Sequence, residues 1–222
     1  DSPNDSFLSE LPFEIFPLGP GKFGFAYSSK LKTWLGAHID QYDCVLIEGL
    51  WLYTSSIGTK IARKHSIPYF VFPHGMLDPW FQRIRERGVI KPLRNFAYWH
   101  LIEKAVINHA QAIFYTCEQE KRLASTTFSC FRPQAEEVVG LGTSAPPKFE
   151  EAFTAAFRHR CPGITNSPYL LYLSRIHPKK GLDLLLNAYG RYIQDSAEQN
   201  KSPLRLVIAG PGIESAFGQG IS

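Results

Sequence analysis

Residues 169–189 read YLLYLSRIHPKKGLDLLLNAY, and residues 204–212 read LRLVIAGPG. The first stretch opens with an apolar run at 169–173, passes through a basic turn, and continues with leucines on one helical face. The second stretch is another apolar run, and it ends in a glycine turn. A strand, a helix and a second strand in this order predict a βαβ unit with two parallel strands.

The same alternation runs through the preceding part of the chain. Short apolar runs between turn residues indicate buried strands, and apolar residues at helical spacing separate them. The pattern predicts an α/β protein with parallel strands between helices. The expected strands are 13–18, 44–47, 69–72, 112–115 and 138–141, and the expected helices are about 23–38, 54–64, two within 76–108, and 118–125.

The composition changes between residues 144 and 167, where prolines bracket a polar, weakly patterned stretch. We therefore expect a first domain at 1–143, an interdomain linker at 144–167 and the start of a second domain at 168–222. Two strands and one helix are too few to bury an independent core. We expect that domain to continue past Ser222, and the start DSPNDSFLSELPFE to be the interior of a longer protein.

The overall composition is that of a soluble globular protein, with 44% hydrophobic and 20% charged residues. No apolar run is long enough for a membrane-spanning helix. The formal net charge of +4 suits phosphate-bearing substrates or an anionic membrane surface and is too small to indicate nucleic-acid binding. The cysteines are widely spaced, which disfavours a metal cage or disulfide framework and favours free thiols in a reducing compartment (Cys44, Cys117, Cys130 and Cys161).

Ligands of open parallel sheets bind beyond the carboxyl ends of the strands. His74 and Gly75 directly follow the expected strand at 69–72. The histidine can donate or accept a hydrogen bond at a sugar hydroxyl or a phosphate, and the glycine lets a ligand approach the backbone. A histidine that merely caps the strand end is the alternative.

Arg175 and Lys180 flank the turn that follows the strand at 169–173. Lys180 lies next to a predicted helix N-terminus, which attracts phosphate through its unpaired N–H groups. Arginine offers a bidentate fork and lysine a point charge, a suitable pair for a diphosphate. A solvated basic turn is the alternative, and it is the favoured interpretation of Lys179.

Glycines occur in two further turns. Gly210 and Gly212, after the strand at 204–209, either admit the phosphates of a nucleotide or make a tight turn. Gly19, Gly21 and Gly24 satisfy a GxGxxG pattern, but Pro20 interrupts it and no acidic residue follows at the required distance. We interpret this second group as a turn.

A basic stretch between residues 83 and 94 alternates with apolar residues. A solvated helix face is the favoured interpretation. A patch that contacts the acceptor or an anionic membrane surface is the functional alternative. The cations are Arg83, Arg85, Arg87, Lys91 and Arg94, and the apolar residues are Phe81, Ile84, Val89 and Leu93.

The sequence at 169–189 resembles the first strand, turn and helix of the donor lobe in glycosyltransferase family 4, and VIAGPG at 207–212 is similar to the next strand and glycine turn of that family. Upstream segments follow the order of the acceptor lobe, and the resemblance covers roughly residues 13–212 with RxxxxKG as its most specific element. These segments are YDCVLIEGLW (42–51), PYFVFPHGMLDPW (68–80), AIFYTCEQEK (112–121) and EVVGLGTS (137–144).

The resemblance implies a GT-B fold, in which two Rossmann-like parallel-sheet lobes face a cleft, with the second lobe incomplete here. It implies a retaining transfer of a sugar, of hexosyl type, from a nucleotide-diphosphate sugar to a carbohydrate or lipid-linked acceptor. Arg175 and Lys180 would hold the donor diphosphate near Gly212 and stabilise the charge on the leaving group. His74 would lie against the transferred sugar. The leaving phosphate would assist deprotonation of the acceptor.

The resemblance further implies that the nucleotide-sugar donor is the only small molecule needed, without a metal or another cofactor. It suggests an enzyme of polysaccharide or glycolipid biosynthesis. We expect a cytoplasmic location, and the functional alternative for the basic stretch Arg83–Arg94 adds a peripheral contact at the inner face of the membrane. Glu48 departs from the family, because similar sequences often carry histidine there. The family's glycine-rich first loop and donor-binding glutamate pair are expected before Asp1 and after Ser222.

Two other functions fit the same residues. A nucleotide-sugar epimerase or a phosphorylase would share the architecture, although the RIHPKKG spacing favours a transferase. An inactive remnant or a sugar- or nucleotide-binding module is the non-enzymatic alternative, and the incomplete second lobe favours it for this chain.

Overall fold

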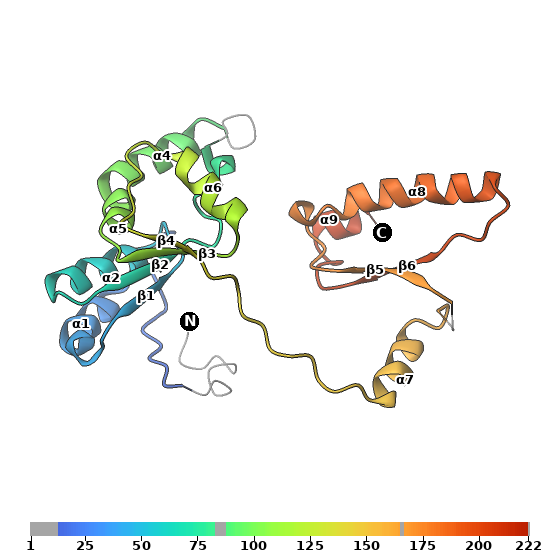
Figure 1. Cartoon of the computed structure of the whole chain (residues 1–222), viewed down its shortest axis with the longest axis horizontal. Coiled ribbons are helices and arrows are strands. Elements are labelled where there is room, and N and C mark those ends of the chain that lie inside the picture. Colours follow the sequence, from blue (N-terminus) through green and yellow to red (C-terminus); the bar gives the residue numbers. More distant parts are fainter. Residues whose placement is uncertain (1–12, 83–87, 165–166, 222) are drawn as a thin grey trace. The chain divides into compact units, whose positions relative to one another are not determined.

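The computed structural model describes residues 13–82, 88–164 and 167–221. The chain divides into two compact units, Asp1–Ser144 (unit 1) and Ala145–Ser222 (unit 2), and each is described by itself. Both units combine parallel strands with helices (Figure 1), so the predicted α/β class is confirmed.

Unit 1 contains a four-stranded parallel sheet in which every strand pairs with its neighbour in the sequence. Val45 lies opposite Tyr69, Phe70 opposite Ala112, and Ile113 opposite Glu136. Continuous apolar runs form the two central strands, 69–72 and 112–115, because helices cover the sheet. The strands are β1 (Val45–Glu48), β2 (Tyr69–Phe72), β3 (Ala112–Tyr115) and β4 (Glu136–Val138).

Amphipathic helices connect these strands and supply the other half of the core. Val71 and Ile113 of the sheet belong to one buried cluster with Ile57, Trp99 and Ile107 of the helices. Ser28 caps the first helix, because its hydroxyl accepts a hydrogen bond from Leu31 N at 3.2 Å. The helices are α1 (Ser29–His38), η2 (Ile39–Gln41), α2 (Tyr53–Lys64), η3 (Pro79–Gln82), α4 (Ile90–Tyr98), η4 (Trp99–Glu103), α5 (Lys104–Asn108) and α6 (Glu118–Thr127).

The segment from Ile90 to Asn108 is one helical path with a π-helical turn in its middle, where two separate helices were expected within 76–108. Trp99 opens the π turn and is fully buried. Its indole ring stacks on Phe128 with 4.6 Å between ring centroids, and its Nε1 donates to Ser129 O. Short π segments inside α-helices frequently mark functional positions.

Three expectations for unit 1 are wrong. Residues 13–18 form no strand, and the first helix begins at Ser29 because a turn closed by the Lys22–Tyr27 bridge occupies the preceding residues. The last strand is Glu136–Val138, so it begins two residues before the apolar run at 138–141.

Unit 2 has a two-stranded parallel sheet covered by a long helix, as the βαβ pattern predicts (Figure 1). Gly181 (φ +67°) makes the left-handed step between the basic turn and this helix, a conformation that glycine adopts readily. The elements are α7 (Glu151–Arg160), β5 (Tyr169–Leu173), η5 (Pro178–Lys180), α8 (Leu182–Glu198), β6 (Arg205–Ala209) and α9 (Ala216–Gln219).

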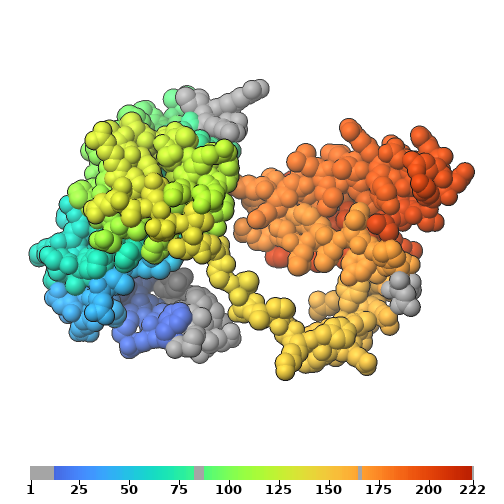
Figure 2. Space-filling model, in the orientation of Figure 1, coloured from blue at the N-terminus to red at the C-terminus, as the bar shows by residue number. Residues whose placement is uncertain are grey.

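The stretch predicted as a linker, 144–167, contains a helix, α7. All ten residues from 141 to 150 are exposed and form no helix or strand. Figure 2 shows this stretch as a single file of residues.

Unit 2 buries few apolar side chains. Leu171, Leu173 and Leu184 are 52%, 76% and 69% exposed, and each would favour removal from water. Within the residues that the structure describes, this sheet of two strands also leaves both of its edges unpaired. The buried hydrophobic residues among those described in unit 2 are Ile164, Ile176, Leu182 and Val207.

Candidate functional site

The carboxyl ends of β1, β2 and β3 bring polar side chains together at one edge of the unit 1 sheet. Glu48 is the last residue of β1, and His74 lies two residues after β2. Thr116 directly follows β3. These strands are neighbours, so their ends meet at the edge where parallel sheets bind ligands.

His74 is held in an unusual conformation by its surroundings. Its backbone is left-handed (φ +50°), which is uncommon for a residue with a side chain. The imidazole stacks on Phe72, with ring centroids 4.5 Å apart and planes inclined by 2°. Nε2 of the ring forms a short hydrogen bond with a carboxylate oxygen of Glu48. Strained backbone of this kind persists only where neighbouring contacts determine it.

The Glu48 contact decides what the His74 ring can do. A carboxylate accepts the Nε2 proton, so Nδ1 of a neutral ring is a hydrogen-bond acceptor. No hydrogen bond reaches Nδ1 from the part of the chain that the structure describes. His74 can therefore accept a hydrogen bond from a ligand hydroxyl.

Gly75 is fixed by Glu120 of α6. The Gly75 amide donates to Oε1 of Glu120 at 2.6 Å, while Oε2 accepts from the Thr116 amide at 2.8 Å and the Thr116 hydroxyl at 2.6 Å. Glu120 is only 9% exposed, so the fully bonded carboxylate ties β3 to the loop after β2. Among the described parts of the chain, a Cβ added to Gly75 would meet no atom within 4 Å, so a ligand has room to approach its Cα.

The loop after β1 is locked against the same region. Trp51 has a left-handed backbone (φ +69°), and its indole Nε1 donates to Met76 O at 3.1 Å. The Trp51 amide donates to Oε1 of Glu103, in the π turn, at 2.7 Å. Trp51 thus joins the His74 loop to the helical path Ile90–Asn108.

Glu103 is the most deeply buried acid in this region, with an exposed fraction of 0%. Burial raises the pKa of its carboxyl to about 7, although the hydrogen bond from the Trp51 amide and the nearby Ser55 hydroxyl act in the opposite direction. The same burial effect raises the pKa of Tyr98, and the nearby Glu103 charge adds to the rise. Glu103 thus ties the loop after β1 to the π turn from a site where its carboxyl is shielded from water.

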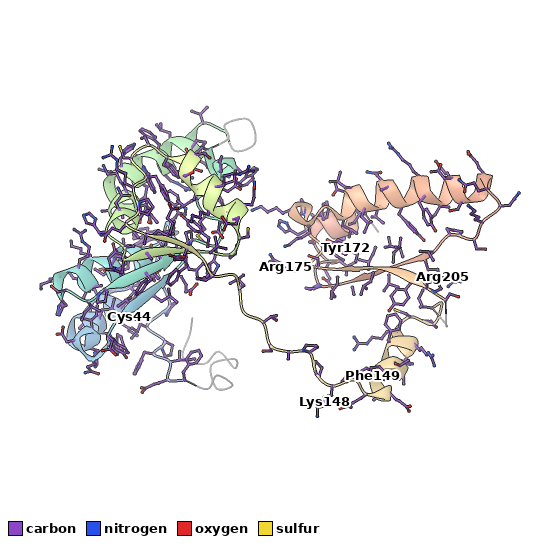
Figure 3. The ribbon with its side chains drawn as sticks, in the orientation of Figure 1. Cys44, Lys148, Phe149, Tyr172, Arg175 and Arg205 are labelled. Carbon is purple, nitrogen blue, oxygen red and sulfur yellow. The ribbon has the colours of Figure 1, made fainter. Side chains whose placement is uncertain are left out.

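In unit 2, Arg175 lies at the carboxyl end of β5, and Figure 3 shows Arg205 at the opposite end of the sheet. Lys180 ends the short turn η5 and stands two residues before α8. Both cationic side chains are exposed. His177 organises the turn between them, because its Nδ1 accepts from the Lys179 amide at 3.1 Å.

Gly210 and Gly212 allow two backbone loops to touch. A Cβ on Gly210 would lie 1.9 Å from Ser174 O, and one on Gly212 would lie 2.6 Å from Ile176 O. The Ile176 amide also donates to Pro211 O at 2.8 Å, which joins the loops after β5 and β6. Both glycines have positive φ, so packing is sufficient reason for their presence.

The predicted site residues therefore fall into two groups. His74 and Gly75 lie together in unit 1, and Arg175, Lys180 and Gly212 lie near the strand ends of unit 2. In the basic stretch, residues 83–87 lie outside the described residues, while Lys91 and Arg94 are exposed on α4.

Sequence reasoning missed three acids that position these loops. Glu48 was noted only as a departure from a family pattern, and Glu103 and Glu120 were not singled out. Glu120 could have been found, because it closely follows the strand at 112–115 and so lies near an edge where strand ends converge. Glu103 carries no such signal, since its partner Trp51 lies 52 positions away.

Together, the parallel sheet and the polar strand ends define a Rossmann-like ligand-binding domain. Residues 5–142 match the family of the glycosyl transferase 4-like domain, and the chain belongs to this family. The predicted resemblance is thereby confirmed, and the membership implies a sugar donor and an acceptor as substrates. No curated protein matches the chain. None of the helices in the described residues is long and apolar enough to span a membrane.

Proposed function

We propose that this chain acts in a retaining glycosyltransferase, which moves a hexose from a nucleotide-diphosphate sugar to a carbohydrate or lipid-linked acceptor. The observation that carries the proposal is His74. Its strained backbone and its pairing with Glu48 fix an imidazole at the strand ends of a glycosyl transferase 4-like domain. In this role Nδ1 of His74 accepts a hydrogen bond from the transferred sugar.

Arg175 and Lys180 bind the donor diphosphate in this proposal. Both are exposed cations in the segment that leads from β5 into α8, a helix of 17 residues whose N-terminus favours anions. Their charge stabilises the negative charge that develops on the leaving diphosphate. Gly212 contributes because its missing side chain lets the loop after β6 pack closely against the loop that carries Arg175.

A peripheral membrane contact belongs to the same proposal. Ile90, Leu93 and Leu101 of the helical path are 83%, 64% and 81% exposed, and Lys91 lies beside them. Exposed apolar side chains next to cations bind anionic interfaces. Such a contact would present the enzyme to a lipid-linked acceptor.

Nucleoside diphosphate release and sugar transfer, measured together with UDP-, GDP- and ADP-sugars, test the proposal. Loss of one charge-assisted contact in Lys180→Ala is expected to weaken binding of the preferred nucleoside diphosphate about 10- to 100-fold. The matched control is Lys201→Ala, which removes the same charge just beyond the opposite end of α8. A chain that neither binds a nucleoside diphosphate nor transfers sugar would be the inactive remnant, and the proposal would be wrong.

A further inference from the structure

A cavity of about 430 Å³ in unit 1 borders the site described above, because Trp51 and Tyr98 are among the residues that line it. Three segments enclose it: the turn at 22–27, the loop after β1, and α4. The Tyr53 amide donates to Phe25 O at 2.8 Å and ties the first two segments together. The side chains that line the cavity include Phe25, Trp51, Leu52, Arg94, Asn95 and Tyr98.

The aromatic side of the cavity suits a sugar ring. Trp51 and Tyr98 meet with ring centroids 6.1 Å apart and planes inclined by 50°, and Phe25 is 42% exposed. A pyranose ring has an apolar C–H face, and large aromatic side chains offer apolar surface while keeping a polar group at their edge. Few other side chains combine both properties in a cavity of this size.

The polar side of the cavity carries an oriented positive charge. Nη2 of Arg94 donates to Oδ1 of Asn95 at 3.1 Å, and Asn95 is 6% exposed and anchored to Phe81 O. This leaves further guanidinium donors for a ligand. Of the residues that line the cavity none is acidic, and no ion pair to Arg94 occurs within the described ranges. The cavity therefore favours an anionic group.

The cavity shares a wall with the His74 loop. Trp51, whose indole forms part of the cavity, donates from Nε1 to Met76 O, and Leu50 N lies 3.1 Å from Met76 Sδ. Met76 is two residues from His74. A ligand in the cavity would thus lie beside the loop that carries the imidazole.

We propose that this cavity binds the acceptor, and that the acceptor is a sugar carrying a carboxylate or phosphate group that Arg94 holds. The role of this ligand as the acceptor rests on the proposed function. The binding of an anionic sugar is inferred from the cavity and does not depend on that function. Unit 2 takes the donor phosphates in that function, so the two anionic sites do not compete.

Titration of the whole chain with glucuronate, glucose 6-phosphate and glucose tests the inference. The readout is the indole ¹H–¹⁵N resonance of Trp51, assigned with Trp51→Phe. At least one anionic sugar is expected to shift this resonance and to bind about 10-fold or more tightly than glucose, because a charge-assisted contact is gained. The anionic sugar that binds also distinguishes a carboxylate acceptor from a phosphate acceptor.

Arg94→Gln is expected to abolish the difference between the anionic sugar and glucose, while Lys91→Gln on the same helix leaves it intact. Equal binding of all three sugars, absence of binding, or an unchanged preference in Arg94→Gln would each overturn the inference. Nucleoside diphosphate binding is measured on the same samples. Its failure would count against the proposed function, while the sugar titration still decides the cavity.

Discussion

Replacement of Glu103 by glutamine gives the sharpest test of how unit 1 is held together. Burial raises the pKa of this carboxyl from 4.5 to about 7, so between these values the folded chain keeps a proton that the unfolded chain releases. The free energy of unfolding therefore falls as the pH rises through this window. The fall is about 1.4 kcal/mol per pH unit, which amounts to about 3 kcal/mol across the whole window.

Glutamine keeps an oxygen that can accept from the Trp51 amide and cannot ionise. Glu103→Gln is expected to be more stable than the unaltered chain at pH 8 by up to about 3 kcal/mol, and this advantage should vanish at pH 4.5. Urea unfolding followed by tryptophan fluorescence measures the free energy of unfolding of the two proteins at each pH, because all four tryptophans lie in unit 1.

The matched control is Glu137→Gln on β4. This side chain is exposed, so its replacement should change stability little at either pH. A stability difference between Glu103→Gln and the unaltered chain that is equal at pH 4.5 and pH 8 would refute the assignment of a buried, protonated Glu103.

Three further predictions concern other parts of the chain. His74→Ala should lower turnover at least 10-fold with little loss of stability, since the His74 ring is partly exposed. A lower melting temperature without a separate kinetic defect would instead indicate that His74 only caps the strand end. Gly210→Ala should destabilise unit 2 by about 2 kcal/mol or more through the clash with Ser174 O, whereas Gly190→Ala on α8 should be neutral or stabilising; circular dichroism during urea unfolding compares them. Leu101→Glu should reduce co-sedimentation with anionic vesicles, and equal sedimentation of both proteins would exclude this helix as the contact.

The buried strands were the most predictable part of the fold. The apolar runs at 69–72, 112–115 and 169–173 match β2, β3 and β5 residue for residue, because short continuous apolar runs are typical of strands in parallel sheets. The same reasoning from an apolar run predicted a strand at 13–18, and that prediction was wrong. Its apolar residues serve a loop, in which Phe16 packs on Trp34 with 4.7 Å between ring centroids.

The start of the first helix shows a competing local signal. Phe23 and Ala26 have positive φ within a tight turn, so the apolar pattern from residue 23 does not continue as a helix. Serine is a favoured N-cap residue, so Ser28 could have placed the start of this helix at Ser29 from the sequence alone.

The contacts of the candidate site were less predictable than its loops. Strand ends pointed to His74 and Arg175 from sequence alone, and their roles in catalysis and donor binding stay predictions. The pairing of Glu48 with His74 depends on which strands are neighbours, and the bond from Trp51 to Glu103 depends on how a distant helix packs. Single-sequence patterns carry local periodicity and do not carry these long-range pairings.

The strand order of unit 1 has a consequence for how the chain acquires its shape during translation. Because β1, β2, β3 and β4 stand in the sheet in the order in which a ribosome releases them, each new strand finds its partner already outside the exit tunnel. Through the four strands that the structure describes, the sheet can thus grow from one side, one crossover at a time. Such vectorial assembly shortens the period in which the apolar face of a nascent strand is open to other chains.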